Sequence, residues 1–144
     1  MKRIAIMISL IAGLILTVAI SIAVEAKGPD KITETSAPPV MTECLTQCKS
    51  CQAKCEHTLS YCQKQGGKHT DAAHIKILKD CITTCKTSQD FMSRGSDLVG
   101  KACALCAEAC KRCAESCATF KDKVMQDCAD ECRKCEQSCA SMAK

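Results

Sequence analysis

The stretch CLTQCKSCQAKC, residues 44–55, spaces its cysteines at steps of four, three and four. Steps that alternate between three and four place side chains on one face of an α-helix, at the a and d positions of a heptad. A strand would need a period of two, and no stretch of the chain shows that period. The stretch therefore predicts a helix with a stripe of thiols along one side.

The same stripe recurs in three later segments, and in the first segment it continues after a step of seven that Leu59 nearly fills. Sixteen residues are cysteine, whereas the chain has two Phe, one Tyr and no Trp. Large apolar residues usually fill an interior, so here the interior must be lined by sulfur. The stripe comprises Cys44, Cys48, Cys51, Cys55, Cys62, Cys81, Cys85, Cys103, Cys106, Cys110, Cys113, Cys117, Cys128, Cys132, Cys135 and Cys139.

Turn and cap residues divide the cysteine-rich part into four helical segments. The residues that carry this prediction are Gly66-Gly67, Thr70-Asp71, Gly95, Ser96-Asp97 and Asp122. The predicted helices cover about 42–65, 70–94, 96–120 and 122–144. Short connections make sequential helices antiparallel. We therefore expect an all-α fold over residues 42–144, an antiparallel four-helix bundle with a cysteine-lined core.

The residues before the predicted bundle differ from it in composition and have a different predicted role. Lys2 and Arg3 precede an apolar run over 4–24, and small residues at 24 and 26 suit a signal peptidase, so 1–26 is predicted to be a signal peptide. The run is also long enough to span a bilayer, which leaves a retained membrane anchor as the alternative. Both predict an exported protein, periplasmic or extracellular. Residues 27–41, which contain three prolines, are expected to form a flexible linker.

Charge excludes one class of partner. The chain has 20 Lys and Arg against 16 Asp and Glu, a net charge of +4, and the two signs alternate along the segments. That is typical of solvated helix faces. With no basic run and few aromatic side chains to stack on bases, the sequence predicts no nucleic-acid partner.

Several roles for the thiols remain open at this stage. Reduced cysteine can pack as a small hydrophobe, but filling most core positions with it sacrifices buried area. A disulfide framework is usual in exported chains, yet residues three or four apart on one helix have Cβ atoms about 5–6 Å apart, too far for a bridge. Zinc or iron–sulfur sites normally draw their cysteines from loops that converge on one point. Disulfides between helices, or a zinc-binding or iron–sulfur-binding helical protein, stay as alternatives.

Copper(I) suits the stripe better. Thiolate sulfur is a soft ligand that copper(I) prefers, and the ion accepts few ligands, so two sulfurs three or four residues apart can hold one ion. Each monovalent ion also neutralises one thiolate, and burying many uncompensated thiolates would be very costly. A column of such pairs predicts several copper(I) ions in one chain.

The pattern at Cys44, Cys48, Cys51 and Cys55, repeated at 103–117 and 128–139, resembles the four-helix-bundle copper storage proteins. The resemblance covers everything after about residue 41. It implies copper(I) held by thiolates inside a bundle, a storage role, and a homo-oligomer, often a tetramer. One feature departs from the pattern, because the second helix carries only Cys81 and Cys85.

Antiparallel order also predicts which residues meet along the bundle. One layer is expected to contain Cys48, Cys85, Cys106 and Cys135, and the next Cys51, Cys81, Cys110 and Cys132; Ser88 faces Cys44, Cys103 and Cys139. Met41, Met92 and Met142 meet at one mouth, either as soft copper(I) ligands or as a hydrophobic plug. The opposite end gathers Cys62, Met125, Phe120 and His74, of which His74 is a candidate ligand.

No enzyme activity is expected. Thiol–disulfide exchange requires one exposed cysteine of low pKa beside a resolving partner, and no pair here differs from the others. The three histidines are scattered and lie beside no nucleophile, which speaks against a hydrolase. A thiol redox protein remains the alternative of a different class. A protein that donates or accepts copper is the expected partner, and a membrane only if the N-terminal segment is retained.

Overall fold

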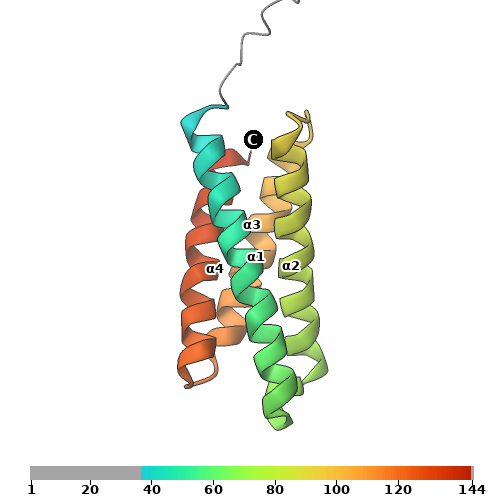
Figure 1. Ribbon diagram of the computed structural model, residues 1–144, viewed down its shortest axis with the longest axis vertical. Helices are drawn as coiled ribbons and strands as arrows, with labels where there is room; N and C mark the ends of the chain where they lie inside the picture. The colour runs from blue at the N-terminus through green and yellow to red at the C-terminus, as the bar shows by residue number, and fades with distance from the viewer. Residues whose placement is uncertain (1–36, 144) are drawn as a thin grey trace, which may run out of the picture. The chain divides into compact units, whose positions relative to one another are not determined.

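The computed structural model describes residues 37–143, which contain four long helices in an antiparallel bundle (Figure 1). The helices are α1 (Pro39–Gln65), α2 (Ala72–Ser93), α3 (Val99–Ala118) and α4 (Lys123–Met142), with a short 3₁₀ helix, η1 (Gly67–Thr70), between the first two. Each long helix packs against the two beside it, so that α1 closes the ring by contacting α4. The predicted all-α bundle is confirmed.

Local sequence explains most helix ends. The carboxylate of Asp71 accepts hydrogen bonds from the backbone N–H groups of Ala73 and His74, and so caps α2. Gly95 follows the end of α2 with φ of +63°, a conformation that only glycine adopts without strain. Asp122 caps α4 by accepting from the N–H of Met125. These three predicted boundaries are confirmed.

Two helix starts differ from the prediction. The first helix begins at Pro39, inside the segment predicted to be a linker, because proline at the first helical position needs no hydrogen bond for its nitrogen. The third helix begins at Val99 rather than at Ser96-Asp97. There the Ser96 hydroxyl accepts from the N–H of Leu98 in a tight turn and does not cap the helix.

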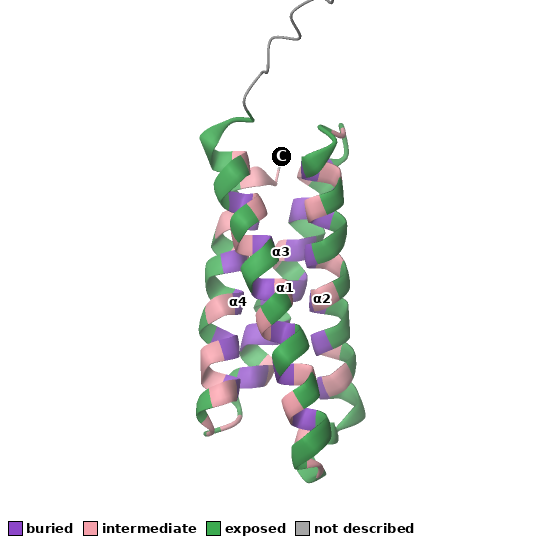
Figure 2. Cartoon of the chain, viewed as in Figure 1, coloured by how far each residue is buried: buried purple, intermediate pink, exposed green. Residues whose placement is uncertain are grey.

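The core is a column of sulfur along the bundle axis. All sixteen cysteines have no exposed surface. Figure 2 shows the buried residues recurring along each helix on the side that faces the other helices. Larger core side chains, among them Leu78, Met92, Val99 and Met125, stand toward the two ends of the helices.

The gap in the first stripe is filled by a different residue from the one predicted. Thr58 has no exposed surface, whereas Leu59 is only partly buried against the core. Thr58 continues the alternation of steps, three residues after Cys55 and four before Cys62, and so lies on the same helix face as the cysteines. The stripe on α1 therefore continues through a hydroxyl rather than an isobutyl group.

The predicted signal peptide or membrane anchor (residues 1–26) lies outside the described residues, as does the linker as far as residue 36. Within residues 37–143, no helix combines the length and the apolar character needed to cross a bilayer.

Candidate metal centre

Thiols from all four helices meet in the layers that the antiparallel order predicts. In one layer the Sγ of Cys85 lies 3.6 Å from that of Cys106 and 4.0 Å from that of Cys135. The Sγ of Cys135 lies 3.9 Å from that of Cys48, which comes from the opposite end of the sequence. The bundle thus brings together four thiols that lie far apart in the chain.

The next layer is built in the same way. The Sγ of Cys51 lies 3.9 Å from that of Cys81 and 3.9 Å from that of Cys110. Its distance to the Sγ of Cys132 is 3.7 Å. This layer, too, has one thiol from each helix, as predicted.

Toward the α1 N-terminus the column ends in a layer with three thiols. The Sγ atoms of Cys44 and Cys139 are 3.7 Å apart, and the fully buried Cys103 of α3 is close enough to interact with both, so that its pKa is raised. The fourth place, on α2, belongs to Ser88, whose buried hydroxyl donates to the backbone carbonyl of Ala102. Serine has no thiol, and its hydroxyl already bonds to the backbone, so α2 contributes no soft ligand to this layer.

The thiols also form groups compact enough to hold a metal ion, with all sulfurs of a group within 4.8 Å of one another. Five groups of four share one construction: two cysteines four residues apart on one helix, and one cysteine from each of two other helices. The groups are Cys48, Cys106, Cys135 and Cys139; Cys51, Cys81, Cys85 and Cys110; Cys51, Cys55, Cys81 and Cys132; Cys55, Cys113, Cys128 and Cys132; and Cys85, Cys106, Cys110 and Cys135.

The spacing of these sulfurs is close to that of thiolates that share one metal ion. At a metal–sulfur distance of about 2.3 Å, as in thiolate sites of the first-row ion zinc, two opposed sulfurs are about 4.6 Å apart and three around one ion about 4.0 Å apart. Neighbouring sulfurs in the column are 3.4–4.0 Å apart. Small side-chain movements would therefore complete such sites without moving the helices.

All sixteen cysteines are free thiols. The shortest distance between two of them is 3.4 Å, from Cys48 Sγ to Cys139 Sγ, far longer than the disulfide bond length of about 2.05 Å. The helices keep the sulfurs in contact but unbonded. The geometry thus favours ligands over cross-links.

Neighbouring thiols shift each other's pKa. The hydrogen bond from Cys110 lowers the pKa of Cys51, because it stabilises the thiolate. The pKa of Cys110 itself is raised, first by its hydrogen bond with Cys106, since Cys110 keeps a proton that its neighbours share. The thiols therefore cannot all ionise together, and a buried cation is needed to compensate further thiolates.

The predicted methionine mouth lies at the end where α1 and α3 begin and α2 and α4 end (Figure 1). Met92 is buried in the core, and Met41 and Met142 are partly buried against it. Val99 completes this end from α3. The structure thus gathers all three predicted methionines at one end of the thiol column.

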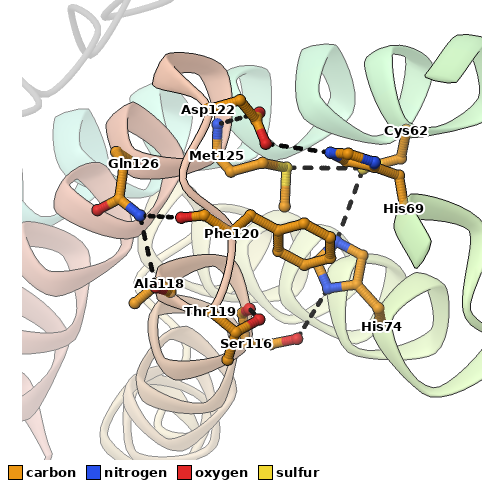
Figure 3. A network of polar contacts seen from close by, with 10 residues as sticks. All are labelled: Cys62, His69, His74, Ser116, Ala118, Thr119, Phe120, Asp122, Met125 and Gln126. Carbon is orange, nitrogen blue, oxygen red and sulfur yellow. Dashed lines mark hydrogen bonds and ion pairs between the residues drawn. The ribbon is translucent and has the colours of Figure 1, made fainter.

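The opposite end combines different donors (Figure 3). The Sγ of Cys62 lies 3.6 Å from His74 Nε2 and 3.7 Å from Met125 Sδ. The other ring nitrogen of His74, Nδ1, is 2.7 Å from the hydroxyl of Ser116. The sequence predicted that Cys62, His74 and Met125 would meet here, but it gave no ligand role to Met125 and no role to Ser116.

The other two histidines behave differently. His57 is exposed on α1, as expected for a solvated residue. His69, in η1, has its Nε2 3.1 Å from the carboxylate of Asp122, and its ring packs against Phe120 with the ring centres 4.7 Å apart. Asp122 thus joins the α3–α4 connection to η1. Sequence spacing gives no sign of this pairing, because the two residues are 53 positions apart.

The column of buried thiols has a counterpart in known proteins. A sequence profile described as copper storage protein matches residues 38–144. Among solved structures, the Nmul_A1745 protein from Nitrosospira multiformis is 35% identical, with a TM-score of 0.69 over 72% of this chain and 94% of that chain. No curated protein sequence matches the chain.

Two further similar structures are those of copper storage proteins. The copper(I)-bound copper storage protein BsCsp3 is 28% identical, with a TM-score of 0.70 over 73% of this chain and 99% of that chain. The copper-free copper storage protein 3 from Bacillus subtilis is 27% identical, with a TM-score of 0.65 over 72% and 98%. The family match, the shared bundle and the buried thiols agree, and the chain belongs to the copper storage protein family.

Proposed function

We infer that this protein binds and stores several copper(I) ions inside its four-helix bundle. The observation that carries the inference is the column of sixteen fully buried thiols, arranged in groups whose sulfurs lie within 4.8 Å of one another. Membership of the copper storage protein family supports it.

The construction of the groups favours a monovalent ion. Cys51 and Cys81, for example, each belong to two groups, so neighbouring sites share sulfurs. A copper(I) ion neutralises one thiolate, and shared thiolates let a chain of such ions stay close to neutral in a medium that penalises net charge. Zinc at four separate thiolates would leave a charge of minus two in each site.

The proposed ligands are the sixteen cysteines, together with His74 at one end and the three mouth methionines, Met41, Met92 and Met142, at the other. The cysteines would form the tight sites. The mouth methionines would make shorter-lived contacts where ions enter or leave the column.

A thiol redox protein is the competing function, and burial speaks against it. Thiol–disulfide exchange proceeds by attack of an accessible thiolate. Here every cysteine is without exposed surface. We therefore propose that the protein stores its cargo and performs no turnover.

We also propose that the protein is exported, to the periplasm or the cell exterior, because of the apolar segment at residues 4–24. A homo-oligomer is proposed on the family resemblance. Leu98 and Leu105 support it as apolar side chains of α3 and the turn before it, with 46% and 61% of their surface exposed. A protein that delivers or withdraws copper is the proposed partner.

Titration with copper(I) tests the storage function. The reduced protein is titrated with copper(I) in the presence of a chromophoric copper(I) chelator that binds more weakly than the protein. The coloured complex of copper(I) with the chelator then appears only once the protein is saturated. Storage predicts saturation at several ions or more per chain. Saturation at one or two ions would contradict storage and indicate a transfer protein, and a parallel zinc titration that reached the same capacity with tighter binding would contradict the choice of metal.

A further inference from the structure

The end of the bundle where α1 leads into η1 contains a set of donors unlike the rest of the column. In the described residues, the contacts of the Cys62 sulfur are with a nitrogen and a thioether, whereas the thiols of the layers contact other thiols. His74 is 4% exposed and Met125 has no exposed surface. The three donors come from α1, α2 and α4, and the His74 nitrogen and the Met125 sulfur both contact the buried Cys62 sulfur (Figure 3).

We propose that Cys62, His74 and Met125 form a discrete site for a single copper(I) ion, bound by one thiolate, one imidazole nitrogen and one thioether. The proposal rests on the proposed copper function and deepens it by assigning this end site its own ligand set, with Met125 as a ligand and Ser116 as a positioning residue.

The two distances from the Cys62 sulfur suit a three-coordinate ion. With bonds of about 2.0 Å to nitrogen and about 2.3 Å to sulfur, donors spread around an ion in one plane are about 3.7 Å apart for nitrogen and sulfur and about 4.0 Å apart for two sulfurs. The observed separations from Cys62 Sγ are 3.6 Å to His74 Nε2 and 3.7 Å to Met125 Sδ. An ion can therefore enter with only slight movement of the side chains.

The imidazole is held in the orientation that binding requires. Ser116 Oγ lies 2.7 Å from His74 Nδ1. When Nδ1–H donates to this hydroxyl, Nε2 keeps its lone pair and directs it toward Cys62. A partner on the second ring nitrogen is the usual way in which proteins fix a metal-binding histidine.

The site is set apart from the thiol column on two of the four helices. On α1, Thr58 lies between Cys55 and Cys62, and on α2, Leu78 lies between His74 and Cys81. Both Thr58 and Leu78 are fully buried. Neither side chain offers a soft donor, so the i,i+4 thiol pairs of the column do not continue into this end.

Aromatic residues cover the site. The ring of Phe120 lies 4.8 Å from that of His74, centre to centre, and 4.7 Å from that of His69. Asp122 holds His69 through the 3.1 Å contact at Nε2. This cover keeps water from the donors and gives the site a low-dielectric surrounding.

The binding step balances in charge. A copper(I) ion replaces the proton of the Cys62 thiol, which leaves to solvent, and His74 and Met125 bind without losing a proton. The resulting centre is neutral, because one positive ion meets one thiolate. A neutral centre is the form that a buried site tolerates at least cost.

Nuclear magnetic resonance of the unaltered protein tests the proposal directly. Long-range ¹H–¹⁵N correlation spectra report the state of each histidine nitrogen, and copper(I) is diamagnetic. As copper(I) is added to the reduced protein, the Nε2 signal of His74 should shift and then stop changing after one equivalent has entered this site. The signals of the exposed His57 provide the internal control and should stay where they are.

Variants supply the second readout. Met125→Leu, which conserves volume, and His74→Gln should each lower the copper(I) capacity by one ion per chain, whereas His57→Gln should leave it unchanged. Ser116→Ala should keep the capacity but weaken this one site about 10–100-fold, since its role is to orient the imidazole. Circular dichroism of each variant checks the fold.

The outcomes separate this proposal from the storage function. If the column fills with copper(I) while the His74 Nε2 signal stays at its metal-free position, the end site does not exist and storage stands. If the unaltered protein binds no copper(I), storage itself fails. A variant that does not fold leaves the spectra of the unaltered protein to decide.

Discussion

The Sγ of Cys48 lies 3.4 Å from the Sγ of Cys139, although 91 residues separate them in the chain. They belong to the first and last helices, which meet only because the bundle closes on itself. No local sequence signal can place these two atoms in contact. Copper binding in this protein is therefore a property of the assembled bundle, and the predictions below depend on that.

The copper-free, reduced protein should already be largely helical. The helices have capping aspartates, and cysteine packs as a small apolar residue when no metal is present. Far-ultraviolet circular dichroism with and without copper(I) should give similar helical signals. A copper-free form that proved mostly unfolded would mean that metal nucleates the fold, as it does in zinc fingers.

Capacity should fall in small steps when cysteines are removed. Cys113 shares a group with Cys55, Cys128 and Cys132, and the other four groups described above do not use it. Cys113→Ala should therefore lose one or two copper(I) ions and keep the rest, as measured by chelator competition. Complete loss of binding from this one change would instead indicate a single cooperative cluster.

Replacing Met41, Met92 and Met142 together by leucine should slow copper(I) loading without changing the final capacity. Thioethers bind copper(I) without releasing a proton, so they suit rapid exchange at the mouth, and the thiolates beyond bind more tightly. Leucine nearly conserves the volume, so stability should change little. Stopped-flow loading measures the rate. Unaltered kinetics would show that the methionines only plug the end, and a delay should then appear in His74→Leu.

Acid should destabilise the copper-free protein through His74. Burial lowers the pKa of His74, so the unfolded chain takes up this proton more readily than the folded one. The free energy of unfolding should therefore decrease as the pH falls below about 6.5, by at most about 1.4 kcal/mol per pH unit for this one proton. Denaturant melts between pH 5.5 and 7.5 measure the slope, which should be smaller in His74→Gln.

Asp122 titrates at lower pH than His74, so it does not contribute to the slope measured between pH 5.5 and 7.5. Burial alone would raise the pKa of Asp122, but the hydrogen bond with His69 and those from the backbone bring it below its usual value. Its contribution to stability is lost only when the pH falls below about 4. If His74→Gln and the unaltered protein had the same slope above pH 5.5, His74 would not be the acid-sensitive group.

The sequence predicted the bundle, its antiparallel order and the two full thiol layers, because a stripe at steps of three and four admits one arrangement once short loops are present. The i,i+4 pairs are local, and so they too followed from spacing. The prediction that Leu59 fills the gap in the first stripe was wrong. After the step of four to Cys55, strict alternation gives a step of three, which is Thr58, so the spacing itself contained the correct position.

Individual side-chain contacts between helices could not be predicted from the sequence. The hydroxyl of Ser116 beside His74 Nδ1, and Asp122 beside His69, join residues 42 and 53 positions apart. The sequence marked Asp122 only as a helix cap and gave no role to Ser116, because serine and aspartate are common on helix surfaces and at caps. Only the register of α3 and the α3–α4 connection against α2 and η1 selects them.

The helices that contribute cysteines to the five thiol groups described above limit how the bundle can release its copper(I) ions. Each group takes sulfur from three helices and leaves out the fourth, and the helix left out changes along the column: α2, α4, α3, α2 and α1 in the order in which the groups were given. Swinging α1, α3 or α4 outward would break four of the five groups at once, and swinging α2 would break three. No helix can move outward without breaking several of these groups, so the filled groups hold the four helices together. We therefore expect the ions to leave through the ends of the bundle, so that exchange at an end, rather than an opening between helices, limits how fast the store can be emptied.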